Sequence, residues 1–317
     1  MIQRDINLHQ TVKNVRLYFN TLDYRTPHFH RDIEIIWALE NGLEIQIGSE
    51  LWNVHEGEMI LLNSEQPHEI KTTGKSCTIL GVQISPDLVA EEVPELVHIH
   101  FDEYFVNSIP ENIFRGTKQI LLDVMGKYLT KNDYYELYCK SQMQLFIYTL
   151  LSNLPYRILT EEQTQIQEKQ NARLQRLIRF VDQNYMNNIR LADFADSEGR
   201  SLGCVSHFVQ TTMRQSFREY VDLVRYNAAC KMMATGQYKM LDICVECGFS
   251  DYRYFSKAFM KRTGLTPEAY SRRLLEKIGD ETSFKHSIHS REKFYTPEQS
   301  LRLLARFREK YVYQETQ

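Results

Sequence analysis

Long uninterrupted apolar runs are missing from this sequence of 317 residues. No stretch approaches the roughly 20 apolar residues that span a bilayer, and the start, Met1–Asp5, lacks the apolar core of a secretory signal. The six cysteines, without an export signal, fit buried thiols better than a disulfide framework. These absences predict a cytoplasmic protein with no membrane contact and no redox role.

Motifs of the common enzyme classes are also missing. The chain has no phosphate-binding glycine loop, no Gly-x-Ser-x-Gly elbow and no His-Glu-x-x-His metalloprotease pair. Cys244 and Cys247 have the spacing of a redox or zinc pair, but no second pair lies nearby and both fall in a predicted helix. We therefore expect no catalytic residues, no cofactor and no enzymatic activity.

What the chain does contain is enough apolar material for about two domains. Apolar residues make up 43% and charged residues 25%, which excludes a wholly disordered chain or a coiled rod. The charge is unevenly placed: residues 1–154 carry 12 Lys and Arg against 21 Asp and Glu, whereas residues 173–279 carry 17 against 11. An acidic front half before a basic back half is typical of a protein in which one domain meets a polyanion.

The front half reads as an antiparallel sandwich or barrel followed by helices. Asn41-Gly42 is a hairpin signal between two apolar runs, and the apolar period changes from two to about 3.6 after Pro110. The polar segment 158–171 has few core anchors and reads as a linker, helical or not. The expected strands are 15–21, 33–40, 43–47, 58–62 and 77–84, and the expected helices are 113–129 and 134–151.

From Arg173 onward the sequence predicts short helices joined by tight turns. The first expected helix has its apolar residues on one face over 174–185. The others are expected at 191–196, 203–213, 217–233, 241–247, 251–262 and 267–277. We expect an α+β chain of five parts: a barrel over 1–109, a helical hairpin over 110–154, a linker over 155–172, an all-helical domain over 173–279 and an extension over 280–317.

Two segments of the helical domain share one pattern. Each has a short helix with a small residue inside, Ala195 or Cys244, then a glycine, Gly199 or Gly248, and then a second helix. A glycine at that point allows the sharp turn, with positive φ, that lays the second helix across the first. The pattern predicts two helix-turn-helix motifs.

The second motif resembles the signature of the AraC/XylS family of transcription regulators. The matching residues are Gly248-Phe249-Ser250-Asp251, Tyr254-Phe255-Ser256-Lys257 with Phe259, Gly264 with Thr266-Pro267, and Tyr270. The resemblance extends over residues 172–273, although Val209 and Arg214 depart from it in the first motif. It implies a regulator that binds double-stranded DNA and a small-molecule effector such as a sugar, pairs as a homodimer and contacts RNA polymerase.

The second helix of each motif has an inward and an outward face. Phe255 and Phe259, four residues apart, are expected to be core, as are Val205 and Val209. Most of the outward side chains carry donors that reach base edges or phosphates, and the family places its DNA contacts at these outward positions. The expected DNA-contacting residues are Leu202, Gly203, Ser206, His207, Gln210, Tyr252, Arg253, Ser256, Lys257 and Lys261.

The barrel half resembles the cupin motifs. His28, His30 and Glu34 have spacings of two and six, which place all three on one face of a strand, and His68 follows later. Such residues hold a divalent metal or, as in the sensor cupins that the family resemblance implies, line a polar pocket for an organic effector. We expect these four residues and Trp37 to bind the effector, without a metal.

Two further segments leave alternatives open. The helix 134–151 is the candidate for dimerisation, or it caps the barrel. The extension contains a capping box at Thr296 and an apolar stripe, Leu301 to Tyr311, that has to be buried somewhere. The rival functions are a cupin metalloenzyme with a helical appendage and a regulator that senses a metal itself.

Overall fold

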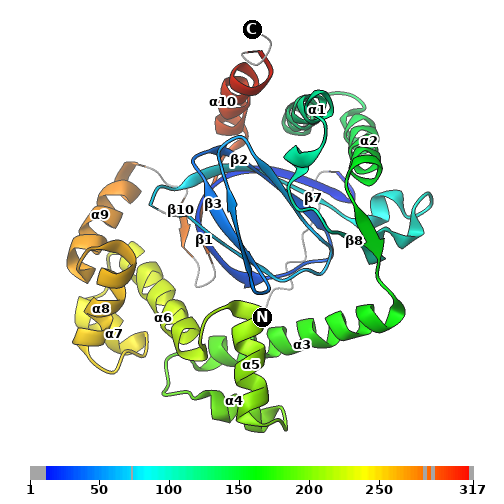
Figure 1. The fold of residues 1–317 in the computed structure, drawn as a ribbon. Coiled ribbons are helices and arrows are strands. Elements are labelled where there is room, and N and C mark those ends of the chain that lie inside the picture. Colours follow the sequence, from blue (N-terminus) through cyan, green and yellow to red (C-terminus); the bar gives the residue numbers. More distant parts are fainter. Residues whose placement is uncertain (1–11, 73, 281–283, 287–289, 314–317) are drawn as a thin grey trace.

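The computed structural model describes residues 12–72, 74–280, 284–286 and 290–313. Its first part is an antiparallel sheet that curves into a barrel, seen end-on in Figure 1. The expected barrel is confirmed, and three of the five strands begin and end where the sequence predicts. The strands are β1 (Val15–His28), β2 (Ile33–Glu40), β3 (Leu43–Ile47), β4 (Glu50–Val54), β5 (Met59–Leu62), β6 (His68–Lys71) and β7 (Cys77–Ile84).

The strand β2 is buried on both faces, which explains its continuous apolar sequence. Ile36 and Ala38 point into the barrel, whereas Trp37 and Leu39 point outward beneath a layer of helices. Side chains at alternate positions of β2 therefore belong to two different cores, one inside the barrel and one beneath the helices. The long strand β1 pairs with two strands along its length: with β7 over its first half and with β6 at its end.

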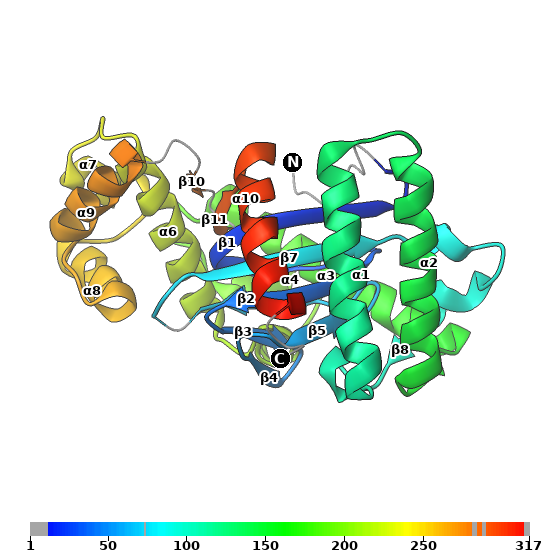
Figure 2. The ribbon, with the colours of Figure 1, turned by 90° about the horizontal axis from the view of Figure 1, so that it is seen from above.

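Helices cover one side of the barrel, as Figures 1 and 2 show. The helices α1 and α2 pack on each other, and α10 packs on α1. Their bounds are α1 (Glu111–Thr130), α2 (Tyr135–Asn153) and α10 (Pro297–Arg308). Short elements join these parts: η1 (Pro86–Val89), η2 (Pro94–His98), η3 (Val106–Ser108), η4 (Glu309–Tyr313), and the paired strands β8 (Ile99–Phe101) and β9 (Tyr156–Ile158).

The segment expected as a linker is the first half of a long helix, α3 (Glu161–Asn184). Thr160 and Gln163 form a capping box at its start, so the helix continues through the boundary expected at 172/173. The helices that follow agree with the sequence to within three residues. They are α4 (Leu191–Ser197), α5 (Leu202–Met213), α6 (Phe217–Ala234), α7 (Met240–Glu246), α8 (Tyr252–Thr263) and α9 (Pro267–Asp280).

The C-terminal extension returns from the helical domain to the barrel. It consists of β10 (Phe284–His286), β11 (Ser290–Phe294) and then α10, and β11 pairs with β1 on the edge opposite β6. Phe307 and Tyr311 are buried in the barrel's outer core, where the Tyr311 hydroxyl donates to the carbonyl of Leu39 at 2.7 Å. Of the apolar stripe of the extension, Leu304, Phe307 and Tyr311 are thus buried on their own chain, whereas Leu301 is exposed.

Candidate nucleic-acid interface and barrel site

Both helix-turn-helix motifs have the expected turns. Gly199 ends the first turn with φ +60° and Gly248 the second with φ +78°. The inward residues are buried as predicted: Phe255 and Phe259 in one core, Val205 and Val209 in another. Burial of one face fixes which side chains of α5 and α8 point to solvent.

The outward face of α8 is cationic. The side chain of Arg253 is 91% exposed and lies 3.1 Å from the carboxylate of Asp251. Asp251 caps the helix by accepting from the backbone N–H groups of Arg253 and Tyr254, and these bonds hold its pKa below the usual range. Lys257 and Lys261 follow along the helix and are exposed. This face offers donors of the kind that reach guanine edges and phosphates.

Two of the residues predicted on α8 are only half-exposed. The Tyr252 hydroxyl donates to the carboxylate of Glu268 at the start of α9, so this side chain points toward α9. Ser256 is half-buried between the inward and outward faces. The sequence prediction did not include Tyr254, which is 52% exposed. The signal was available, because Tyr254, Lys257 and Lys261 have the spacing of one helix face.

The outward face of α5 is nearly neutral. Its predicted DNA-contacting residues are all exposed except Ser206, which is half-buried. None of these five residues is Lys or Arg, so α5 offers only neutral donors, acceptors and apolar contacts. The predicted residues on α5 are Leu202, Gly203, Ser206, His207 and Gln210.

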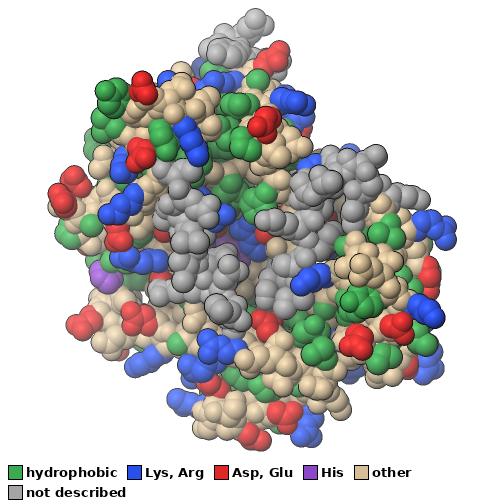
Figure 3. Space-filling model, turned by 180° about the vertical axis from the view of Figure 1, so that it is seen from behind, with side chains coloured by type: hydrophobic (Ala, Val, Ile, Leu, Met, Phe, Trp, Pro, Cys, Tyr) green, Lys and Arg blue, Asp and Glu red, His purple; other side chains and the backbone are tan. Residues whose placement is uncertain are grey.

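A groove of about 1020 Å³ lies between the two outward faces. Ser206 and Gln210 of α5 line one side of it, and Lys257 and Lys261 of α8 line the other, with α6 running between them (Figure 1). A concave surface rich in cations accommodates a phosphate backbone. Its charged lining residues are Arg190, Arg218, Glu219, Asp222, Arg225, Lys257, Lys261 and Arg262. Elsewhere, on the face shown in Figure 3, acidic and basic side chains are interspersed.

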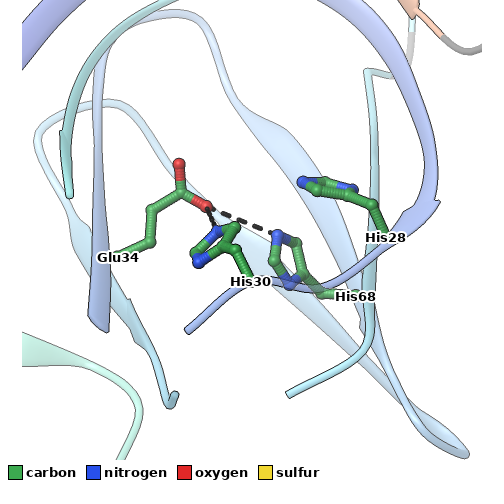
Figure 4. A group of neighbouring side chains, drawn as sticks. All are labelled: His28, His30, Glu34 and His68. Atoms are coloured by element: carbon green, nitrogen blue, oxygen red, sulfur yellow. Dashed lines mark hydrogen bonds and ion pairs between the residues drawn. The ribbon is translucent and has the colours of Figure 1, made fainter. Parts of the chain in front are cut away.

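The barrel brings together four of the five residues predicted to bind an effector. His28, His30, Glu34 and His68 each place one ligand atom within 4.8 Å of the others (Figure 4). The expectation of one shared strand is wrong, because the chain turns between β1 and β2: His28 ends β1, His30 lies in the connection and Glu34 is on β2. His68 joins them because it pairs with His28 across β1 and β6.

Trp37 is not part of this cluster. It lies on the opposite face of β2 from Glu34, fully buried in the outer core with its ring 5.0 Å from that of Tyr311. The alternation of side chains along a strand separates positions 34 and 37. The grouping of Trp37 with the effector-binding residues is therefore not supported.

Glu34 is the centre of the cluster. Its Oε1 atom accepts from the Tyr18 hydroxyl at 2.8 Å and from the Gln83 amide at 2.9 Å. Its Oε2 atom lies 3.1 Å from His30 Nε2 and 3.4 Å from His68 Nε2. Burial alone raises the pKa of Glu34, but the contacts with His30 and His68 outweigh it and hold that pKa well below its usual range.

The histidines experience different environments. Burial, together with the neighbouring His68, holds the pKa of His28 well below its usual value. Burial also lowers the pKa of His68, whereas for His30 the opposing effect of Glu34 is larger and its pKa is raised. The cluster is therefore an ionised carboxylate facing imidazoles of which His28 stays neutral.

Comparison with known proteins identifies relatives over most of the chain. Residues 194–273 match a family model described as a helix-turn-helix domain. The HTH-type transcriptional regulator YdeC of Bacillus subtilis is 22% identical over 85% of this chain and 96% of its own. ExsA of Pseudomonas aeruginosa is 21% identical over 78% of this chain and 87% of its own. The melibiose operon regulatory protein of Escherichia coli is 20% identical over 77% of this chain and 83% of its own.

Among solved structures, ToxT of Vibrio cholerae aligns over 83% of this chain and 98% of its own, at 14% identity and a TM-score of 0.41. Within the described residues of the present chain, no helix is both long and apolar enough to cross a membrane.

Proposed function

We propose that this chain, a member of the AraC family of transcription regulators, binds specific duplex DNA by inserting α5 and α8 into successive major grooves. The observation that carries the proposal is the two-sided character of α8. Phe255 and Phe259 anchor it in a core, while Arg253, Lys257 and Lys261 face solvent beside a cationic groove. A helix held by its apolar side and exposing cations fits major-groove recognition.

The two helices have different roles in this proposal. Arg253 and Lys257 of α8 contact base edges, because Arg and Lys donate to guanine O6 and N7. Lys261 and the arginines of the groove contact phosphates and set the register. The neutral face of α5, with His207 and Gln210, adds less discrimination between sequences, since its side chains make fewer bidentate contacts.

The barrel is the proposed sensor. A small-molecule effector, a sugar by family analogy, binds at the polar cluster of His28, His30, Glu34 and His68. Polar groups that converge at one place inside a barrel are a usual means of selecting a ligand. The effector regulates transcription, through contacts with RNA polymerase, to the extent that it binds more tightly to the DNA-competent conformation.

The helix α2 is the proposed dimer contact. Tyr134, at the N-cap, and then Leu137, Leu145 and Tyr148 are all exposed, and their spacing of three, eight and three residues places them along one stripe. Ser141, also exposed, lies on the same face between Leu137 and Leu145. Exposed apolar residues on both sides of it fit pairing of the helix with a second copy of itself. A homodimer presents two sets of recognition helices to a repeated operator site.

Genome-wide mapping of bound sites, followed by footprinting of the full chain on a mapped duplex, tests the proposal. We expect a protected region whose affinity falls steeply with salt, and about tenfold weaker binding for Arg253→Ala. Lys231→Ala, an exposed cation of the same domain outside the groove, is the matched control and should bind as wild type. Equal affinity for mapped and scrambled duplexes would refute sequence-specific recognition.

A further inference from the structure

The strand β11 belongs to the barrel although it follows the helical domain in sequence. It pairs with the edge of β1 that faces away from β6 and β7, and Glu292 lies opposite Leu22. Glu292 and Phe294, two residues apart, point into the barrel, where Phe294 packs against the inner core. The inner side of β11 is therefore part of the barrel wall.

The carboxylate of Glu292 is bound inside the barrel. Its Oε2 atom accepts from the Asn20 amide and from the Arg25 guanidinium, each at 2.6 Å, and all three side chains are buried. The same guanidinium lies 3.9 Å from Glu34 Oε1, an oxygen of the polar cluster. Arg25 is therefore shared between β11 and the cluster. Moving it away from Glu292 leaves a buried carboxylate without its charge partner, which is unfavourable.

Arg291 points the other way, toward the helical domain. Adjacent residues of a strand lie on opposite faces, and the register with β1 shifts at Asp23, so that Arg291 lies opposite Tyr24. Tyr24 packs into the core of the second motif, and the Arg291 guanidinium donates to the Tyr226 hydroxyl of α6 at 3.1 Å. One strand thus holds the barrel with one face and the second motif with the other.

Tyr226 continues this contact to the recognition helix α8. It is fully buried, and its ring centroid lies 5.4 Å from the guanidinium of Arg291 and 5.2 Å from that of Arg262 of α8. Its ring is also 4.7 Å from that of Phe259, which anchors α8 in the core. Arg262 lines the groove beside the outward face of α8. The position of β11 therefore bears on α8 through a single buried side chain.

We propose that β11 is a latch that couples the barrel to the recognition helix α8. While Glu292 is paired with Arg25, β11 stays on β1, and Arg291 holds Tyr226 and with it α8. When that pair breaks, β11 loosens and the second motif loses this support. The first motif keeps its own contacts with the barrel, through Phe29 and α3.

The latch gives the barrel site a route to α8. A ligand at the cluster that draws Arg25 toward Glu34 competes with Glu292 for the guanidinium and so loosens β11. This link to a ligand rests on the sensor role proposed above. The latch itself consists of contacts within the chain, so its test needs neither DNA nor effector, and either idea can fail without the other.

Hydrogen–deuterium exchange of the full chain, followed by mass spectrometry of its peptides, tests the latch. Glu292→Gln removes a charge whose hydrogen-bond partners lie in the barrel, yet it should speed amide exchange at least tenfold in α8 as well as in β11, and leave α5 unchanged. Arg291→Gln removes the contact with Tyr226 and should speed exchange in α8 but not in β11. Glu309→Gln, an exposed carboxylate of the same extension, is the matched control and should exchange as wild type.

Folding is checked separately, because Glu292 is buried. Circular dichroism should show the same helix and strand content for each variant as for wild type. The proposal is overturned if folded Glu292→Gln exchanges α8 at the wild-type rate. It is equally overturned if α5 and α8 speed up together, because that result means general loosening of the helical domain. Should Glu292→Gln not fold, the half-buried Arg291→Gln decides, and unchanged exchange of its α8 overturns the latch.

Discussion

At the scale of single residues, two glycines with the same place in the two motifs meet different surroundings. A Cβ added at Gly248 would lie 2.7 Å from backbone atoms of Tyr185 and Met186, whereas at Gly199 it would meet nothing within 4 Å. Both have positive φ, which disfavours any other residue. At position 248 both the backbone angle and the close contact disfavour any residue other than glycine, whereas at position 199 only the backbone angle does.

This difference predicts unequal costs for the same substitution. Gly199→Ala should lower the free energy of unfolding by about 1–2 kcal/mol, the cost of a left-handed residue. Gly248→Ala should cost roughly 3 kcal/mol or more, because the backbone of the α3 end has to move as well. Urea unfolding of both variants, followed by circular dichroism, measures the two values. Equal losses would mean that the contact with Met186 is not tight.

The three exposed cations of α8 also have unequal roles in the proposed DNA complex, because two contact base edges and one contacts phosphates. In the proposed pose Lys257→Ala and Arg253→Ala each weaken binding to the specific duplex about tenfold, whereas Lys261→Ala weakens specific and unrelated duplexes alike. Loss of the phosphate contact should also reduce the slope of log affinity against log salt by about one. Fluorescence anisotropy over a salt series distinguishes the two classes. A uniform loss in all three variants would assign every one of these residues to the phosphates.

The residues of the α8 face could be read from the sequence because they depend on local spacing alone. Phe255 and Phe259 define the inward side, and their neighbours follow from the helical period. The barrel cluster could be predicted only in part. His28 and His68 meet through strand pairing across 40 residues, which local spacing does not encode. The separation of Trp37 from Glu34, in contrast, follows from spacing, because positions 34 and 37 of one strand lie on opposite faces.

At the scale of elements, the strands missed by sequence reasoning are short or polar. β4 contains Glu50 and Asn53, β6 is four residues long, and β11 has the sequence Ser-Arg-Glu-Lys-Phe. Their strand conformation comes from pairing with distant partners, which local propensity does not encode. The first half of α3 is predicted as a linker, helical or not, because it is polar, and only the second half is predicted as a helix. The capping box and the contact of Asn171 with the barrel support one continuous helix.

The exposed stripe of α2 gives a prediction for assembly. Leu145→Lys should shift the protein from dimer to monomer, because a charge in the centre of an apolar contact is costly to bury. Sedimentation velocity over a range of concentrations measures this. Leu241→Lys, at an exposed leucine of α7 in the helical domain, is the matched control and should leave the assembly unchanged. A wild-type chain that stays monomeric at all concentrations would exclude α2 as a dimer contact.

At the scale of the whole molecule, barrel and helical domain are connected at several points. In α3 the Asn171 amide donates to the carbonyl of Glu65 at 2.7 Å, and the N–H of Glu65 donates to the carbonyl of His30 at 2.8 Å. Phe29 of the barrel packs into the core of the first motif. A change at the histidine cluster thus has a short path of direct contacts to the helix that leads into the DNA-binding motifs.

The C-terminal extension makes a second connection. In β11, Arg291 donates to the Tyr226 hydroxyl of α6, and the adjacent Glu292 accepts from Arg25 and Asn20 of β1. Neighbouring residues of one strand therefore hold the helical domain and the barrel. The helix α10 then covers the barrel's outer core, so that the barrel is completed by residues that follow the DNA-binding domain in sequence.

Because α10 covers the barrel's outer core, a substitution in α10 should destabilise the barrel. Phe307 is 1% exposed in the barrel's outer core, and Phe307→Ala should cost about 3–5 kcal/mol. Both tryptophans of the chain lie in the barrel, so tryptophan fluorescence during urea unfolding reports on that domain. Leu301→Ala, on the same helix but 39% exposed, should cost much less. Equal midpoints for the two variants would show that the barrel is stable without α10.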